Sequence, residues 1–412
     1  MNKTSCEVLI VGGGAAGLSA AAAASKTARV LIADDNPNLG GQIWRAELGK
    51  TKSPQALELI KSIGSGKVQV MNNAQIFAAS GTNCLLAETP EGRIELEYEK
   101  LIIATGARER FLPFPGWTLP GVFGAGGLQA LVKGGLSVAG KRIVVSGTGP
   151  LLFAVADYLK NKGAIVAAIA EQATSFNIRR FGLHLLARPS KLAQAITIRS
   201  RLLNIPYLTG CWVTKAIGDE KLTAVTLVSG GRSWDVECDF LACGFHLVPN
   251  TELASILGCR IDNGYVAVDE FQRTSANGIY CAGEPTGMAG VESSLAEGKI
   301  AGLAATGQSE TARSLFAERD RARGFGNALN DAFALRNELK TLAQPDTIVC
   351  RCEDVTYGRL SEFDNSREAK LQTRCGMGSC QGRVCGAANE FLFGWKPGTV
   401  RPPIFPVRME EL

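Results

Sequence analysis

The chain has 412 residues, of which 46% are hydrophobic and 20% charged, with 47 glycines and a formal net charge of +5. This length predicts two or three domains, and the composition is ordinary for a glycine-rich α/β protein. The charge is mild and there is no lysine or arginine run, so nothing favours nucleic-acid binding. No apolar stretch reaches the roughly 18–20 residues of a membrane span, and the N-terminal apolar run is too short for a secretion signal. We therefore expect a cytoplasmic protein.

The N-terminal residues predict a βαβ unit that binds a dinucleotide. A strand-length apolar run, CEVLIV, is followed by Gly12, Gly14 and Gly17, then by an alanine-rich helix and a second strand, ARVLIADD. These glycines suit a tight turn, close approach to a pyrophosphate and helix–strand packing, in that order. Asp35 is expected to accept the ribose hydroxyls, with Asp34 as the neighbouring candidate.

Two further segments resemble those that hold the flavin in FAD-dependent pyridine-nucleotide oxidoreductases. In NPNLGGQI, the backbone at Gly41 would approach the cofactor and Gln42 would reach the isoalloxazine. In EKLIIATGARER, a buried strand ends at Thr105 and Gly106. The proline-rich stretch 113–120 then fits a crossover to a second domain.

A second fingerprint begins in RIVVSGTGPLL, where Gly147 and Gly149 follow a strand and Glu171 ends the next strand. Leu152 replaces the third glycine. Together with Pro150, it should hold the helix further from the strand and narrow the nicotinamide site. The domain is thus dinucleotide-binding by descent, and the sequence leaves open whether it binds NAD(P), a structural ATP or nothing.

The segment TSANGIYCAGE resembles the other FAD signature of the same superfamily, a strand that delivers an acid to the ribityl chain. Gly283 and Glu284 carry it here, with glutamate in place of the more usual aspartate. The segment 290–302 is expected to be a helix whose N-terminus faces the flavin. Residues 308–345 are charged and predicted to be helical, as a linker.

Several kinds of catalytic chemistry find no support in the sequence. No C-x-x-C pair follows the first βαβ unit, which argues against a disulfide reductase. The two histidines, His184 and His246, are interpreted as structural or surface residues. No serine, histidine and acid constellation stands out, so the catalytic residues remain unknown.

Five of the twelve cysteines gather near the C-terminus, at Cys350, Cys352, Cys375, Cys380 and Cys385. Clustered thiolates suit a soft metal site, and the single-residue spacing of the first pair is too close for a zinc knuckle. An iron–sulfur cluster is the better match, and we predict a small [2Fe-2S] domain. Chance clustering or a disulfide pair is the alternative.

The cysteine spacing resembles that of the bacterioferritin-associated-ferredoxin type of [2Fe-2S] domain. Matching residue by residue, the resemblance implies Cys350, Cys352, Cys380 and Cys385 as ligands. The last pair departs from the pattern, because it is C-x4-C and not C-x2-C. This departure leaves Cys375 as a competing ligand.

With these FAD signatures and the tail CRCEDV…TRCGMGSCQGRVCG, nearly the whole chain resembles the larger flavin subunit of bacterial heteromeric amino-acid dehydrogenases. This family includes opine oxidase, hydrogen cyanide synthase, dye-linked L-proline dehydrogenase and D-hydroxyproline dehydrogenase. The resemblance implies a partner like D-amino-acid oxidase that binds the amine. It leaves open a small ferredoxin-like subunit and FMN at a subunit interface.

The resemblance thus favours an electron-transfer subunit that contains FAD and [2Fe-2S]. A self-contained NAD(P)H-dependent reductase and a non-catalytic iron–sulfur scaffold are the alternatives. The expected fold is α/β, with two glutathione-reductase-like Rossmann domains and a helical [2Fe-2S] domain. The expected boundaries are 1–110 with 245–307 for FAD, 111–244 for the degenerate nucleotide domain, 308–345 for the linker and 346–412 for the cluster domain.

Overall fold

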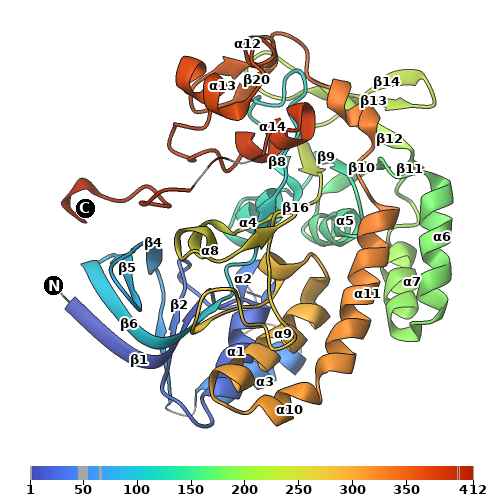
Figure 1. The fold of residues 1–412 in the computed structure, drawn as a ribbon. Coiled ribbons are helices and arrows are strands. Elements are labelled where there is room, and N and C mark those ends of the chain that lie inside the picture. Colours follow the sequence, from blue (N-terminus) through green and yellow to red (C-terminus); the bar gives the residue numbers. More distant parts are fainter. Residues whose placement is uncertain (1, 45–53, 65–66, 397, 399, 412) are drawn as a thin grey trace. The chain divides into compact units, whose positions relative to one another are not determined.

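A computed structural model describes residues 2–44, 54–64, 67–396, 398 and 400–411 (Figure 1). The chain forms two compact units. The first contains residues 1–108, 249–327 and 399–412, and the second contains residues 109–248 and 328–398. The chain passes between the units at β7 (Ala107–Glu109), β16 (Leu247–Pro249) and α11 (Phe316–Ala332), and again after residue 398.

The first unit is built on a seven-stranded sheet in the order β3-β2-β1-β6-β5-β4, with β19 also pairing with β6. Strands β1, β2, β3, β6 and β19 run parallel, and β4 and β5 add an antiparallel edge. Its elements are β1 (Asn2–Val11), α1 (Ala15–Ala24), β2 (Val30–Ala33), α2 (Gly41–Trp44), α3 (Pro54–Ile63), β3 (Val68–Met71), β4 (Gln75–Ala79), β5 (Cys84–Thr89), β6 (Gly92–Ile103), α8 (Glu252–Ile256), β17 (Ile261–Asp262), β18 (Tyr265–Val266), β19 (Ile279–Cys281), η2 (Glu284–Thr286), α9 (Gly290–Ala305), α10 (Ser309–Arg313) and η4 (Met409–Glu411).

Helices α1 and α9 pack together in the core of this unit at backbone distance. A Cβ on Gly298 would lie 2.1 Å from the carbonyl oxygen of Ala16, and a Cβ on Gly302 would lie 2.3 Å from that of Ala20. The alanines of α1 are small enough to allow the same approach from the other side. The two helices are therefore held at a distance that only small side chains permit.

The second unit has a parallel five-stranded sheet in the order β11-β10-β9-β15-β8. An antiparallel sheet, β12-β13-β14, belongs to the same unit. Its elements are β8 (Val122–Gly124), α4 (Ala125–Lys133), β9 (Arg142–Gly147), α5 (Leu151–Asn161), β10 (Ile165–Glu171), α6 (Ser175–Leu186), α7 (Pro189–Arg201), β11 (Tyr207–Thr209), β12 (Cys211–Ile217), β13 (Ala224–Ser229), β14 (Arg232–Glu237), β15 (Phe240–Gly244), η3 (Asn337–Thr341), β20 (Ile348–Cys350), β21 (Val355–Thr356), α12 (Tyr357–Leu360), α13 (Ser366–Thr373) and α14 (Cys385–Phe393).

The cysteine-rich region packs within the second unit. The indole Nε1 of Trp117 donates to the carbonyl oxygen of Ile348 at 2.5 Å, and the guanidinium of Arg351 lies over the same ring. This region has its own small core, which includes Leu360, Trp395 and three of the cysteines. The predicted α/β fold with Rossmann-like domains is confirmed by both sheets.

The sequence-based division placed all of residues 346–412 in one domain, but the structure assigns the last residues to the first unit. The amide of Ile404 donates to the carbonyl oxygen of Phe77, and the guanidinium of Arg408 pairs with Glu88 at 2.5 Å. The carboxylate of Glu411 accepts from the amide of Arg93. No periodic pattern of residues in the sequence predicts these contacts.

We predict that Gly302→Val destabilises the fold by about 1–3 kcal/mol, because the branched side chain must push α1 and α9 apart. Denaturant unfolding measures the change. Gly324→Val in α11 is the matched control, because a Cβ there meets open space. Equal midpoints for the two variants would show that the helices do not depend on this close contact.

Candidate functional site

The first glycine-rich loop joins β1 to α1 through direct backbone contact. Gly12 has a φ of +102°, and a Cβ there would lie 2.3 Å from the carbonyl oxygen of Ala104. A Cβ on Gly17 would lie 1.8 Å from the carbonyl oxygen of Gly12. The loop is therefore fixed between the ends of β1 and β6, and the backbone N–H groups at the start of α1 stay without side-chain caps. Such a helix start suits a pyrophosphate.

The segment around Gly41 lies against this loop. The amide of Gly40 donates to the carbonyl oxygen of Gly13 at 2.8 Å. The Cα of Gly41 is the one neighbour, at 3.8 Å, that a Cβ on Gly14 would meet. Gln42 is exposed at the start of α2.

The two aspartates after β2 have different surroundings. Asp34 is buried, and its Oδ2 accepts from the amide of Gly13 at 2.5 Å while its Oδ1 accepts from the amide of Asn36 at 2.8 Å. This carboxylate therefore fixes the glycine-rich loop. Asp35 is exposed and accepts from the Asn36 side chain. Of the two, Asp35 has the more accessible carboxylate for a ribose.

Thr105 and Gly106 follow β6 and are held by Asn250. The Thr105 hydroxyl donates to the carbonyl oxygen of Asn250 at 2.7 Å, and the Asn250 amide side chain donates back to the carbonyl oxygen of Thr105 at 2.9 Å. Arg108 in turn donates to the side-chain oxygen of Asn250 and pairs with Glu252 at 2.9 Å. Sequence reasoning did not identify Asn250, because it stands alone in a loop without a motif.

Glu284 lies on the turn after β19, close to the same loop. A Cβ on Gly106 would lie 3.8 Å from its Oε2. Burial raises the pKa of the Glu284 carboxyl, and a hydrogen bond from the Ala107 amide partly opposes this shift. The structure thus brings Gly106, Gly283 and Glu284 together with the first glycine-rich loop, because a Cβ on Gly283 would lie 2.9 Å from the side chain of Ala16.

A second acid at this site, Glu297, was not predicted. Its side chain is 1% exposed, and its Oε2 accepts from the amide of Gly283 at 2.8 Å and from the Thr286 hydroxyl at 2.7 Å. Its Oε1 accepts from the Ser293 hydroxyl at 2.9 Å and pairs with Arg323 of α11 at 2.7 Å. Residues 290–302 are helical, as expected. The sequence feature that could have identified Glu297 is its position as an acid within this helix of small residues.

The second fingerprint folds as strand, loop and helix, but its acid is already engaged. Glu171 is fully buried, and its carboxylate accepts from the amides of Gly149 at 2.7 Å and Ala173 at 2.8 Å. Burial raises its pKa to about 7 despite these hydrogen bonds. Leu152, in place of the third glycine, is fully buried in the core of the unit.

The loop of the second fingerprint is covered by the residue that follows α11, Phe333. The Thr148 hydroxyl donates to the carbonyl oxygen of Phe333 at 2.9 Å, and the Nε2 of His246 lies 2.8 Å from the same oxygen. The phenyl ring is 5% exposed, packs edge-on against Phe181 at 5.6 Å, and comes within 3.9 Å of a Cβ on Gly149. His246 is therefore structural, as expected.

The side chain of Gln172 links this loop to the residues that follow Phe333. Its side-chain amide is fully buried and donates to the Thr148 hydroxyl at 2.8 Å and to the carbonyl oxygen of Ala334 at 3.1 Å. Its oxygen accepts from the amide of Arg336 at 3.1 Å. Residues 333–336 thus lie against the second glycine-rich loop at Thr148 and Gly149.

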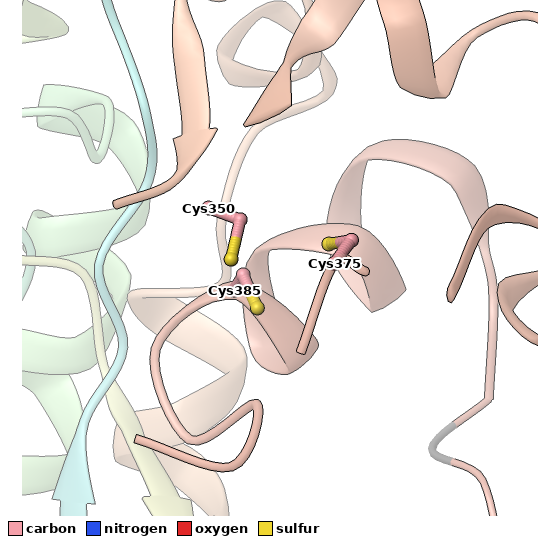
Figure 2. A group of neighbouring side chains, drawn as sticks. All are labelled: Cys350, Cys375 and Cys385. Carbon is pink, nitrogen blue, oxygen red and sulfur yellow. The ribbon is translucent and has the colours of Figure 1, made fainter. Parts of the chain in front are cut away.

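Three buried cysteines from separate segments meet in the C-terminal region (Figure 2). The sulfur atoms of Cys350, Cys375 and Cys385 all lie within 4.8 Å of one another. Neighbouring thiols lower the pKa of Cys350 by donating to its sulfur, and the side-chain amide of Asn389 donates to Cys375 at 3.4 Å. All three are free thiols, so the disulfide alternative finds no support here.

The other two cysteines lie outside this group. Cys352 is exposed, with its sulfur 3.8 Å from the Ser379 hydroxyl, and its pKa is lowered mainly by the backbone amide of Cys380. A Cβ on Gly378 would lie 2.2 Å from the Cβ of Cys352, so the loop runs directly over it. The three grouped thiols, with Cys352 and Cys380 on the adjoining segments, are a donor set that fits a soft metal site such as an iron–sulfur cluster.

Comparisons with known proteins agree with this geometry. The family model described as pyridine nucleotide-disulphide oxidoreductase matches residues 6–302. Hydrogen cyanide synthase subunit HcnB of Pseudomonas aeruginosa is 31% identical, over 92% of this chain and 90% of that protein. An opine oxidase subunit of Rhizobium meliloti is 29% identical, over 98% of this chain and 87% of that protein.

Solved structures share the fold. L-proline dehydrogenase from P. horikoshii has a TM-score of 0.71 at 19% identity, over 100% of this chain and 80% of that one. A thioredoxin reductase of T. acidophilum has a TM-score of 0.58 at 24% identity, over 74% and 99%. Among the helices described in the structure, none is long and apolar enough to cross a membrane.

We predict that Gly14→Val folds but purifies without flavin. The chain itself leaves room for the side chain, whose nearest neighbour is Gly41 at an ordinary contact distance, whereas a bound pyrophosphate would need the same space. The ratio of flavin to protein absorbance measures the loss, and circular dichroism checks the fold. Gly324→Val, in open space, should stay fully yellow. A yellow Gly14→Val would mean that the loop at residues 12–17 does not hold the cofactor.

Proposed function

The chain belongs to the pyridine nucleotide-disulphide oxidoreductase family and is a flavin-dependent oxidoreductase, and on this premise we propose that it is the electron-transfer subunit of a heteromeric amine or imino-acid dehydrogenase. In this proposal a partner like D-amino-acid oxidase oxidises an amine of the D-hydroxyproline, proline or opine class. This chain then receives the electrons and passes them to a further acceptor. Two of its relatives are themselves named as subunits, which supports a partner.

The observation that carries the proposal is the cap over the second glycine-rich loop. Phe333 and Gln172 close the space where NAD(P) would lie. Both carboxylate oxygens of Glu171 already accept hydrogen bonds from backbone amides. Nicotinamide is then not the electron source, which disfavours a stand-alone NAD(P)H reductase. A structural ATP would need the same space.

In the first unit we assign FAD to the backbone-lined loop at Gly12, Gly14 and Gly17. Asp35 would accept the ribose hydroxyls, and Asp34 would hold the loop through the amide of Gly13. Residues near the flavin end are then Gly41, Gln42, Thr105, Gly106, Gly283 and Glu284. FAD supplies hydride and single-electron chemistry.

In the second unit we assign a [2Fe-2S] cluster to Cys350, Cys352, Cys380 and Cys385, with Cys375 as the competing thiol. Cys350 and Cys385 belong to the buried group, which supports them as ligands. Cys375 belongs to the same buried group, whereas Cys352 is exposed and Cys380 is half-buried. Such a cluster supplies one-electron transfer.

Single serine substitutions test the ligand set. We predict that Cys350→Ser and Cys380→Ser lose most of the bound iron, because each removes a thiolate, whereas Cys375→Ser keeps it. Iron content and the visible spectrum measure the outcome. Cys243→Ser, a buried cysteine in β15, controls for the loss of a thiol elsewhere. If Cys380→Ser retains iron and Cys375→Ser loses it, then Cys375 is the ligand and Cys380 is not.

The relay itself is tested with the single chain and with the complex. We predict that the purified chain, loaded with flavin and iron, is not bleached by NADH or NADPH under anaerobic conditions and oxidises no proline, hydroxyproline or opine. Bleaching should require both the amine and the partner subunit. The complex should survive size-exclusion chromatography, as expected for an interface above about 1,000 Å².

Two results would contradict the proposal in different ways. Rapid bleaching of the single chain by NADH would mean that the cap over Gly149 opens, and would establish the reductase alternative. Oxidation of an amino acid by the single chain would place the substrate site in this sequence.

A further inference from the structure

The crossover between β10 and β11 contains more structure than its topology needs. A parallel crossover usually carries one helix, whereas this one carries two, α6 and α7, which lie side by side (Figure 1). Helix α6 fully buries only Phe181, and α7 fully buries no side chain, with Ile198 packed partly against the core. The second helix therefore adds little to the core, and its role is to be sought at the surface.

The exposed surface of this hairpin is unusually apolar. Of the large apolar side chains described in the structure, seven are at least 60% exposed, and five of these belong to the hairpin and the residues that follow it. They are Phe176 at 70%, Leu183 at 67%, Leu186 at 64%, Ile196 at 60% and Leu203 at 68%. Such a concentration marks an interaction site, because single exposed apolar residues are normally scattered.

The same surface is positively charged. From residue 172 to residue 218 the chain has no aspartate or glutamate, while residues 175–203 carry five arginines and one lysine. On α6, Arg179 and Arg180 follow Phe176 by three and four residues and precede Leu183 by four and three, so all four share one exposed face. Asp157 of the neighbouring helix α5 pairs with Arg201 at 3.3 Å.

We propose that the α6–α7 hairpin docks the protein on an anionic lipid surface. Apolar side chains interleaved with arginines match the two chemistries of a membrane interface at once, because the former can enter the acyl boundary and the latter can bind headgroup phosphates. A protein partner would need a face that is both acidic and apolar over the same area. Contact by two short surface helices anchors the chain peripherally, without a spanning segment.

Vesicle sedimentation with the full-length, cofactor-loaded protein tests this surface. The probes are vesicles of pure phosphatidylcholine and vesicles that contain phosphatidylglycerol as about a third of their lipid. We expect binding to the anionic vesicles alone, with an affinity that falls as salt rises. The paired change Arg179→Glu with Arg180→Glu should weaken the partition at least about tenfold. Phe176→Ser with Leu183→Ser should weaken it by a similar factor.

Matched controls separate this effect from general changes in charge or hydrophobicity. Leu371 of α13 is as exposed as Phe176, and Arg367 is an exposed cation on the same helix, so Leu371→Ser and Arg367→Glu should bind as the wild type does. All the substituted side chains are exposed, and thermal unfolding should be unchanged in every variant.

The lipid proposal is overturned if the wild type ignores anionic vesicles, or if the hairpin variants bind them as well as the controls do. Protection of residues 175–203 from hydrogen exchange in a complex with another protein, with no vesicle binding, would make this surface a protein interface instead. Neither result depends on whether the chain relays electrons, since no amine or acceptor enters the measurement.

Discussion

The first unit depends on backbone-to-backbone contact at one point, where the ends of β1 and β6 and the start of α1 meet. At Gly12 and Gly17 there is no space for a side chain, because neighbouring carbonyl oxygens lie where a Cβ would be. The amide of Gly13 is fixed separately by the buried Asp34. The loop therefore has no side chains at these positions, and its backbone N–H groups are held in a fixed orientation. This combination suits the binding of a cofactor phosphate. Helix α9 packs against α1 in the same way, because a Cβ on Gly298 would also meet a backbone carbonyl oxygen.

The second unit starts from the same fingerprint and reaches the opposite result. Its loop is satisfied by the chain itself, since Thr148 and Gln172 form a buried hydrogen-bond network with the backbone at residues 333–336. A buried network in which the members are paired is costly to open, because every freed polar group would lose its partner in a dry environment. The fold of a dinucleotide domain is thereby kept while its glycine-rich loop packs against residues 333–336 of the same chain.

The difference between the two units explains what the sequence could and could not predict. Local patterns identified both glycine-rich loops, both sheets and the helix at 290–302, because each is encoded within a short window. Phe333 was missed because its role arises from a contact with Thr148, which lies 185 residues away in the chain. Glu297 was missed because its hydrogen bond to the amide of Gly283 spans a turn and a helix start that no motif links. The grouping of Cys375 with Cys350 has the same origin, because spacing in sequence does not determine which thiols a loop brings together.

Contacts between residues far apart in the sequence matter most in the cysteine-rich region. Its core includes Cys350, Cys375 and Cys385 among few other buried side chains, so the thiols are both the prospective ligands and a large part of the packing. The pKa of Cys350 is lowered by hydrogen bonds from the Cys375 and Cys385 thiols and from the backbone amides of Gly376 and Glu353. Small domains whose core is too limited to fold on apolar burial alone commonly draw stability from a metal. A cation bound by these thiolates would balance their charge and tie together the segments that carry them, which would link the order of the region to the cluster it is proposed to hold.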